Sequence, residues 1–201
     1  SNGTIIVKRD GTKEHLNIDK IHFVVEEACK GLAGVSSSLI EMNANIQFYD
    51  GMATHEIQEV LVRSANDLIS LDAPNYQYAA ARLLSYGLYK QVFGQYDSVP
   101  LINMINKNIE RGLYDPAILD SYTEEEIATL DRYIHHKRDE NFTYAGLRQV
   151  VDKYLVQDRS TGELFETPQH MYMMIAATLF ANYPAETRMH YVRRYYDATS
   201  L

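Results

Sequence analysis

Two cations and a tight turn lie side by side near the start of the chain, in the stretch VKRDGTKEHLNIDKI. Lys8 and Arg9 precede an Asp-Gly pair, which favours the positive φ angles of a hairpin turn. Asn17 follows as a helix N-cap residue, and Lys20 lies one turn into that helix. If the hairpin folds over the helix, these cations and the N–H groups of the first turn would bind phosphate groups.

The base and ribose of a nucleotide would need further polar partners beside those phosphates. Glu14 and Asn17 supply acceptors and a donor in the same segment. The alternative is a solvated hairpin whose alternating charges, such as Lys13 and Glu14, pair with each other. The chain carries neither GxxxxGK[ST] nor GxGxxG, so neither a Walker loop nor a Rossmann fingerprint is indicated.

Composition limits the classes of partner. A net charge of −8 argues against a protein that binds nucleic acid broadly, which needs a basic face. The single cysteine, Cys29, excludes a disulfide framework within the chain and a cysteine-rich zinc site. There is no apolar run of the roughly 18–20 residues that a membrane span needs, and no signal-peptide pattern at the start. We therefore expect a cytoplasmic protein with no nucleic-acid or membrane partner.

The first half of the chain predicts a β-hairpin followed by four helices. The segments TIIVKR and TKEHL are the two expected strands, and Ser1-Asn2, which resembles an expression-tag remnant, is left out. Apolar residues recur at helical spacing in four stretches that begin near Ile18, Ser37, Thr54 and Pro74. Thr54 is the expected N-cap of the third helix.

The second half predicts further helices and a second short hairpin. Leu101–Arg111 is helical in pattern, and Thr123 with Glu126 matches a capping box. The stretch YLVQDRSTGELFE alternates around a turn, and Pro168 and Pro184 each suit a helix start. The expected fold class is mainly α, with one domain over residues 3–94, a soft boundary at GQYDSVP, and a helical domain over residues 95–201.

The histidines and the acidic run do not predict a metal site. His135 and His136 are helical neighbours that point about 100° apart, so we expect them on a solvated face. His170 and His190 are each isolated and are expected in the core or on the surface. The three glutamates at 124–126 suit the positive end of a helix dipole.

The opening motif VKRDGTKEHLNIDKI resembles the start of an ATP-cone, a nucleotide-sensing module. The likeness continues through IQFYDGMATHEIQEVLVRSANDLISLDAPNYQYAAARLL, the stretch from YTEEEIATL to GELFE, and NYPAETRMHYVRRYYDA. Together they are similar to the N-terminal part of class Ia ribonucleotide reductase large (α) subunits, from about Thr4 onward. The resemblance implies an ATP-cone at 3–94 and the helical start of the catalytic domain at 95–201.

The resemblance also implies what the chain does and lacks. Such large subunits are several times longer and make deoxyribonucleotides for DNA synthesis by radical chemistry on cysteines in a ten-stranded barrel. We expect a fragment of a ribonucleoside-diphosphate reductase that contains no catalytic residue and is inactive alone. Its expected partners are the small radical-bearing β subunit and further copies of itself, in a homodimer or higher oligomer.

Residue roles carry over by position. ATP would keep the enzyme active and dATP would switch it off, with Mg²⁺ left open as a companion of the nucleotide. The resemblance implies phosphate contacts from Lys8, Arg9 and Lys90. It places Glu14, Asn17 and Lys20 around the base and sugar, and Thr54 where the cone closes over adenine.

Two positions depart from the family pattern, because Gln58 and Gly87 stand where a histidine is often found near the phosphates. Gln58 could still donate a hydrogen bond, but Gly87 has no side chain to do so. The expected consequence is either a weaker nucleotide site or an altered ATP/dATP preference. The main alternative function is a helical scaffold or interaction module without a nucleotide site. A cone-bearing transcriptional repressor would need a four-cysteine zinc ribbon, which one cysteine rules out.

Overall fold

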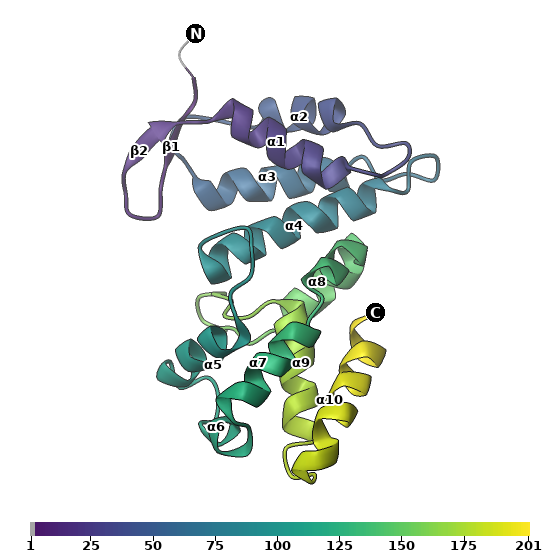
Figure 1. The fold of residues 1–201 in the computed structure, drawn as a ribbon. Helices are drawn as coiled ribbons and strands as arrows, with labels where there is room; N and C mark the ends of the chain where they lie inside the picture. The colour runs from purple at the N-terminus through teal and green to yellow at the C-terminus, as the bar shows by residue number, and fades with distance from the viewer. Residues whose placement is uncertain (1–2) are drawn as a thin grey trace. The chain divides into compact units, whose positions relative to one another are not determined.

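The chain divides into two units, each with its own hydrophobic core. Figure 1 labels the helices and strands of both units. The computed structural model describes residues 3–201, so the two residues that resemble a tag remnant lie outside it. The first unit comprises the chain up to Gly87 together with Glu140–Gln149, and the second comprises Leu88–Asp139 and Val150–Leu201. The expected domains at 3–94 and 95–201 divide the chain at a similar place, but that division stays a prediction.

A three-stranded sheet opens the first unit. Its strands are β1 (Ile5–Val7), β2 (Lys13–His15) and β3 (Met52–Ala53), in the order β2-β1-β3. β1 and β2 form the predicted antiparallel hairpin, with Ile6 opposite Glu14. β3 was not predicted, and it pairs parallel to β1 with Met52 opposite Ile6. The Asp50 carboxylate supports this arrangement by accepting a 2.9 Å hydrogen bond from the Ile5 N–H group.

The hairpin turn is one residue longer than the Asp-Gly signal predicts. The Lys8 N–H group donates to the Thr12 carbonyl over 2.8 Å, which leaves three residues in the loop. Gly11 has a φ of +86°, a conformation that side-chain-bearing residues rarely adopt. The Asp10 carboxylate accepts from the Thr12 N–H and hydroxyl groups, which stabilises the turn from inside.

Four helices complete the first unit, as predicted. They are α1 (Ile18–Cys29), α2 (Ser37–Asn45), α3 (Thr54–Asn66) and α4 (Tyr76–Phe93), whose last residues belong to the second unit. α1 buries residues at helical spacing, namely Ile21, Val24, Val25 and Ala28. α2 packs against both α1 and α3.

The remaining helices belong mainly to the second unit. They are α5 (Leu101–Glu110), α6 (Ala117–Ser121), α7 (Glu124–Tyr133), the 3₁₀ helix η1 (His136–Asn141), α8 (Tyr144–Lys153), α9 (Pro168–Leu179) and α10 (Ala185–Ser200). The capping box of Thr123 and Glu126 is confirmed, and Pro168 does open α9. α6, η1 and α8 were not predicted. The expected second hairpin is reduced to one isolated antiparallel bridge between Gln157 and Leu164.

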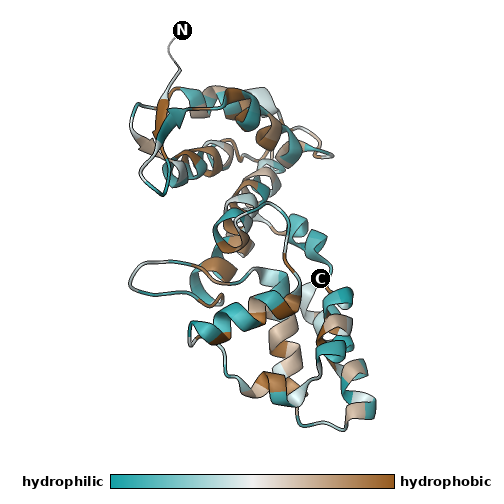
Figure 2. Ribbon diagram, turned by 60° about the vertical axis from the view of Figure 1, so that its left-hand side comes forward, coloured by the Kyte–Doolittle hydropathy of each residue, from teal (hydrophilic) through white to brown (hydrophobic). Residues whose placement is uncertain are grey.

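The predicted class, mainly α with a small N-terminal β element, is confirmed. Apolar residues recur along the helices between hydrophilic ones (Figure 2). Within the described range, no helix has both the length and the apolar character that a bilayer crossing requires.

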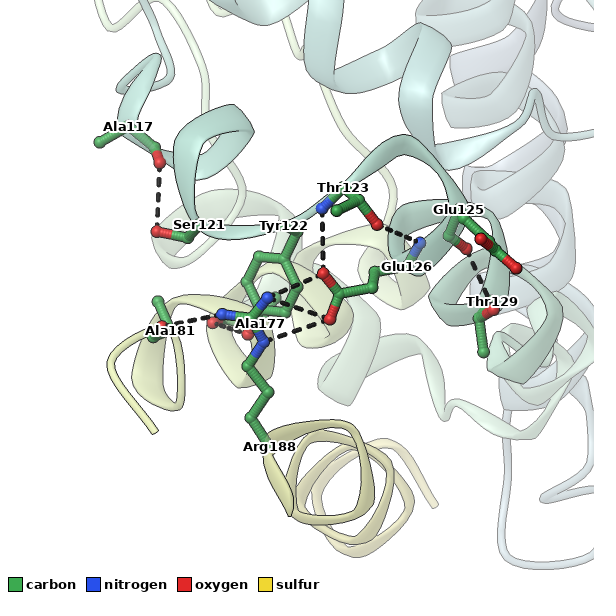
Figure 3. Close-up of polar contacts among 10 residues, drawn as sticks. All are labelled: Ala117, Ser121, Tyr122, Thr123, Glu125, Glu126, Thr129, Ala177, Ala181 and Arg188. Atoms are coloured by element: carbon green, nitrogen blue, oxygen red, sulfur yellow. Dashed lines mark hydrogen bonds and ion pairs between the residues drawn. The ribbon is translucent and has the colours of Figure 1, made fainter. Parts of the chain in front are cut away.

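A partly buried ion pair joins the start of α7 to α10 (Figure 3). The Arg188 guanidinium donates to Glu126, with Nη2 lying 2.8 Å from Oε1, and it lies 4.4 Å over the Tyr122 ring. The Tyr122 hydroxyl in turn donates to the Ala177 carbonyl over 2.6 Å. The acidic helix start is therefore structural, since one of its three glutamates completes both a capping box and an ion pair.

The prediction of a solvated face for the histidine pair is wrong for His136. Its ring lies edge-on to His170, with ring centroids 4.9 Å apart, and His170 is fully buried. The Phe93 ring also packs edge-on against His170, with ring centroids 5.5 Å apart. The adjacent His135 is exposed, as predicted. Its N–H group donates to the Tyr196 hydroxyl over 2.9 Å.

Candidate functional site

The end of β1 brings the first predicted site residues together. Lys8 follows the strand directly, and its ammonium lies 3.1 Å from the Glu14 carboxylate on β2. Both side chains are about half exposed, so this ion pair is weak and a ligand can displace it. Arg9 lies in the turn itself and is exposed. The end of β1 and the turn thus present two of the predicted cations, and one of them, Lys8, is already balanced by a carboxylate.

The start of α1 is capped by the chain itself. The Asn17 side chain accepts a 3.1 Å hydrogen bond from the Lys20 N–H group, which confirms Asn17 as the N-cap. That N–H group is therefore already used, whereas the Asn17 amide nitrogen can still donate to a ligand. The Lys20 side chain is exposed on the first turn.

The start of α3 differs, and here the expected cap is wrong. Ala53 is the N-cap residue and has no side-chain oxygen, whereas Thr54 is the first helical residue. The Thr54 hydroxyl lies 3.5 Å from the Val7 carbonyl, at the end of β1. Because Ala53 also pairs with Val7, the positive end of the α3 dipole begins beside the residue that precedes Lys8.

The two departures from the family pattern form one packed unit between α3 and α4. The Gln58 amide nitrogen donates to the Leu83 carbonyl, and the side chain covers Gly87. A Cβ atom at Gly87 would lie 2.7 Å from Gln58 Cγ, closer than real Cβ contacts. Gln58 is thus already using a donor that the sequence suggested for phosphate.

Lys90 lies in the last turn of α4 and is exposed. Its ammonium lies 5.4 Å from the centroid of the Tyr96 ring, within the second unit. The convergence of Lys90 with Lys8 stays a prediction, because the two residues belong to different units.

The first unit also contains a cavity of about 290 Å³, lined by Gln47, Tyr49, Met52, Glu56, Glu59, Val60 and Arg63. Within residues 3–201, no predicted nucleotide contact lines it, and its two carboxylates disfavour an anion. Across the same residues, no group of three or more potential ligands is placed to hold a metal ion.

Arg82 is the residue that sequence reasoning missed. It lies on α4, and its guanidinium donates to carbonyl groups at the end of α1 and at the start of Glu140–Gln149. A lone arginine within the apolar run YAAARLL was the available signal, because a charge there needs a partner.

Two known protein families match separate parts of the chain. Residues 4–91 match the ATP cone domain family, and residues 140–201 match the family described as ribonucleotide reductase, all-alpha domain.

Curated relatives resemble almost the whole chain. It is 49% identical over 196 residues to ribonucleoside-diphosphate reductase 1 subunit alpha of Escherichia coli strain K12, covering 98% of this chain and 26% of the relative. The α subunit of Haemophilus influenzae is 48% identical, covering 98% of this chain and 26% of the relative. That of enterobacteria phage T4 is 39% identical, covering 97% and 26%. The chain thus spans about a quarter of the length of these relatives.

Proposed function

We propose that this chain is the nucleotide-sensing N-terminal region of a ribonucleoside-diphosphate reductase α subunit, because residues 4–91 match the ATP cone domain family and residues 140–201 match the ribonucleotide reductase all-alpha domain family. ATP and dATP are the proposed effectors, with ATP maintaining activity and dATP stopping it. The high identity to reductase α subunits along nearly the full chain supports this assignment.

The single observation that carries the site is the start of α3 beside the end of β1. A helix N-terminus offers N–H donors and partial positive charge, and Lys8 adds a full charge next to the Val7 carbonyl that Thr54 contacts. We assign the phosphates to Lys8 and Arg9 together with Lys90. Glu14, Asn17, Lys20 and Thr54 are assigned to the base and sugar.

Mg²⁺ would enter with the triphosphate, whose oxygens supply the ligands that this hard cation prefers. Glu14 is the carboxylate among the proposed contacts, and it already pairs with Lys8. We therefore propose no dedicated metal ligand from the protein.

The reduction itself would belong to the longer protein. The only cysteine, Cys29, lies at the end of α1, and burial raises the pKa of its thiol to about 11. Such a thiol is almost wholly protonated at neutral pH and is a poor nucleophile. We propose that these residues regulate ribonucleoside diphosphate reduction and supply no catalytic group.

The proposed partners follow from the same relatives. The region would work with a radical-bearing β subunit and within an α homodimer or a larger assembly, in the cytoplasm. The rival function is a helical scaffold whose hairpin charges are incidental, and the Lys8–Glu14 ion pair is the observation that favours it.

Calorimetric titration with ATP, dATP and adenosine tests the proposal. Lys8→Ala and Lys90→Ala should each weaken triphosphate binding by about 10- to 150-fold, since a charge-assisted contact contributes roughly 1.5–3 kcal/mol. Adenosine binding should change little. Lys13→Ala is the matched control, because Lys13 is an exposed lysine on the same hairpin with no assigned contact. No binding of either triphosphate would favour the scaffold, and equal losses for adenosine would remove both lysines from the phosphate site.

A further inference from the structure

One guanidinium group joins three segments of the first unit that are distant in sequence. Arg82 Nη1 donates to the Lys30 carbonyl over 2.9 Å and to the Ala28 carbonyl over 3.3 Å. Its Nε donates to the Glu140 carbonyl over 3.4 Å. All of these residues lie within the first unit.

The contacts at Ala28 and Lys30 stabilise the end of α1 from outside. The last carbonyl groups of a helix have no intrahelical partner and carry partial negative charge. α1 has no basic residue in its last turn, so Arg82 supplies from α4 the positive charge that such an end usually recruits locally. The end of α1 is thereby fixed to α4.

The contact at Glu140 reaches a different part of the chain. Glu140–Gln149 belongs with the first unit, although the reductase all-alpha family begins at residue 140. Tyr144, the first residue of α8, packs against the hydrophobic core of the first unit. α8 then continues into residues of the second unit. The segment is therefore both a part of the cone unit and the start of the reductase helices.

The residues around Arg82 hold α4 and Glu140 in contact. Arg82 is half-buried on α4, and Tyr86 lies one turn further along the same helix. Burial raises the pKa of Tyr86 to about 12, with the nearby Glu140 charge adding to this and Arg82 opposing it. Arg82, Tyr86 and Glu140 thus form one cluster at the point where the two segments meet.

We propose that Arg82 is a positioning residue that couples α1 to residues 140–149 and so passes the effector signal toward the reductase helices. This inference rests on the proposed function, in which Asn17 and Lys20 at the opposite end of α1 contact the nucleotide. A helix moves as a rigid rod over its 12 residues, so a displacement at its start is carried to its end. At that end, the Arg82 guanidinium donates hydrogen bonds both to the last carbonyl groups of α1 and to the Glu140 carbonyl. A lysine cannot replace it, because one ammonium lacks the planar fork that reaches separate carbonyls.

Hydrogen exchange of the 201-residue protein, with and without saturating ATP or dATP, tests this coupling. In the wild type, nucleotide should slow exchange at least about fivefold both around residues 5–20 and in residues 140–149. In Arg82→Ala the change around 5–20 should remain, and the change at 140–149 should vanish. Arg82→Lys, which keeps the charge and the aliphatic stem, should show the same loss and covers the case in which Arg82→Ala unfolds.

Arg63→Ala is the matched control, since Arg63 is an arginine of the same unit whose guanidinium bonds the Gln47 side chain. It should leave both responses intact. If residues 140–149 respond to nucleotide as strongly in both Arg82 variants as in the wild type, the coupling role is wrong while the proposed function stands. A wild type that responds at 5–20 alone leads to the same conclusion. A wild type that binds no nucleotide, seen as no response in either segment, overturns the proposed function and the coupling with it.

Discussion

Gln58 on α3 and Gly87 on α4 interlock, because the glutamine side chain occupies the space into which any side chain at position 87 would project. A Cβ atom there would approach Gln58 Cγ to 2.7 Å and Cδ to 3.0 Å. Gln58 is held in place by its hydrogen bond to the Leu83 carbonyl, one turn before Gly87. The packing therefore couples the residue that position 58 can hold to the residue that position 87 can hold.

This packing predicts that Gly87→Ala destabilises the wild-type protein but stabilises a protein that already carries Gln58→Ala. In a helix interior, alanine is favoured over glycine by about 1 kcal/mol. In the wild type, however, the new methyl group should displace Gln58, lose its hydrogen bond and cause overpacking, for a net destabilisation of about 1–2 kcal/mol. In a Gln58→Ala background, the same substitution should stabilise by about 1 kcal/mol. Urea unfolding of the four proteins in this cycle measures the coupling, and additive effects would contradict it.

The ion pair between Arg188 and Glu126 predicts a large loss on truncation. Their side chains are 10% and 22% exposed, so removal of the cation leaves a largely desolvated carboxylate. Burial alone would raise the pKa of Glu126, but hydrogen bonds from Thr123 and Arg188 lower it below the ordinary value. Arg188→Ala should destabilise the protein by about 2–3 kcal/mol in urea unfolding. Arg194→Ala, an exposed arginine on the same helix, should stay within about 0.5 kcal/mol.

The buried histidine pair predicts sensitivity to acid. Burial, and then the neighbouring His136, lower the pKa of His170 to about 3, whereas an unfolded histidine titrates near 6.5. Between pH 6.5 and 3 the unfolded chain therefore binds a proton that the folded chain does not. The free energy of unfolding is highest above pH 6.5 and falls as the pH is lowered toward 3. The linkage amounts to about 5 kcal/mol over that window.

His170→Leu removes the titrating ring and should flatten the pH dependence of unfolding between 6.5 and 3. The control is His190→Gln, which changes an exposed histidine on α10 and should leave the dependence as it is in the wild type. If the free energy of unfolding changed equally with pH in the wild type and in His170→Leu, protonation of the His170 ring would not destabilise the fold and the prediction would be wrong.

Local signals predicted local structure well. The alternation on either side of Asp-Gly predicted the β1–β2 hairpin, and Thr123 with Glu126 predicted a capping box that the structure contains. Both depend on residues within a few positions of one another. The same applies to Asn17, whose side chain caps α1 through a residue three positions away.

Features that depend on distant partners escaped sequence reasoning. β3 is two residues long and exists because it pairs with a strand more than forty residues earlier, so no periodicity marks it. His136 is partly buried because His170 packs against it. The charged residues next to it in the sequence had indicated a solvent-exposed position. Arg82 could be flagged as a charge in an apolar run, but its three acceptors lie more than fifty residues away.

The central place of β1 has a consequence for synthesis on the ribosome. The hairpin can form as soon as residue 15 has left the ribosome, but an isolated two-stranded hairpin is only marginally stable in water. Its second edge is covered only after Met52 and Ala53 have been made, once both intervening helices have left the exit tunnel. Nascent chains arrested before that point should therefore lack the contact between Val7 and Thr54, and the first unit as a whole is complete only after residues 140–149 have been made.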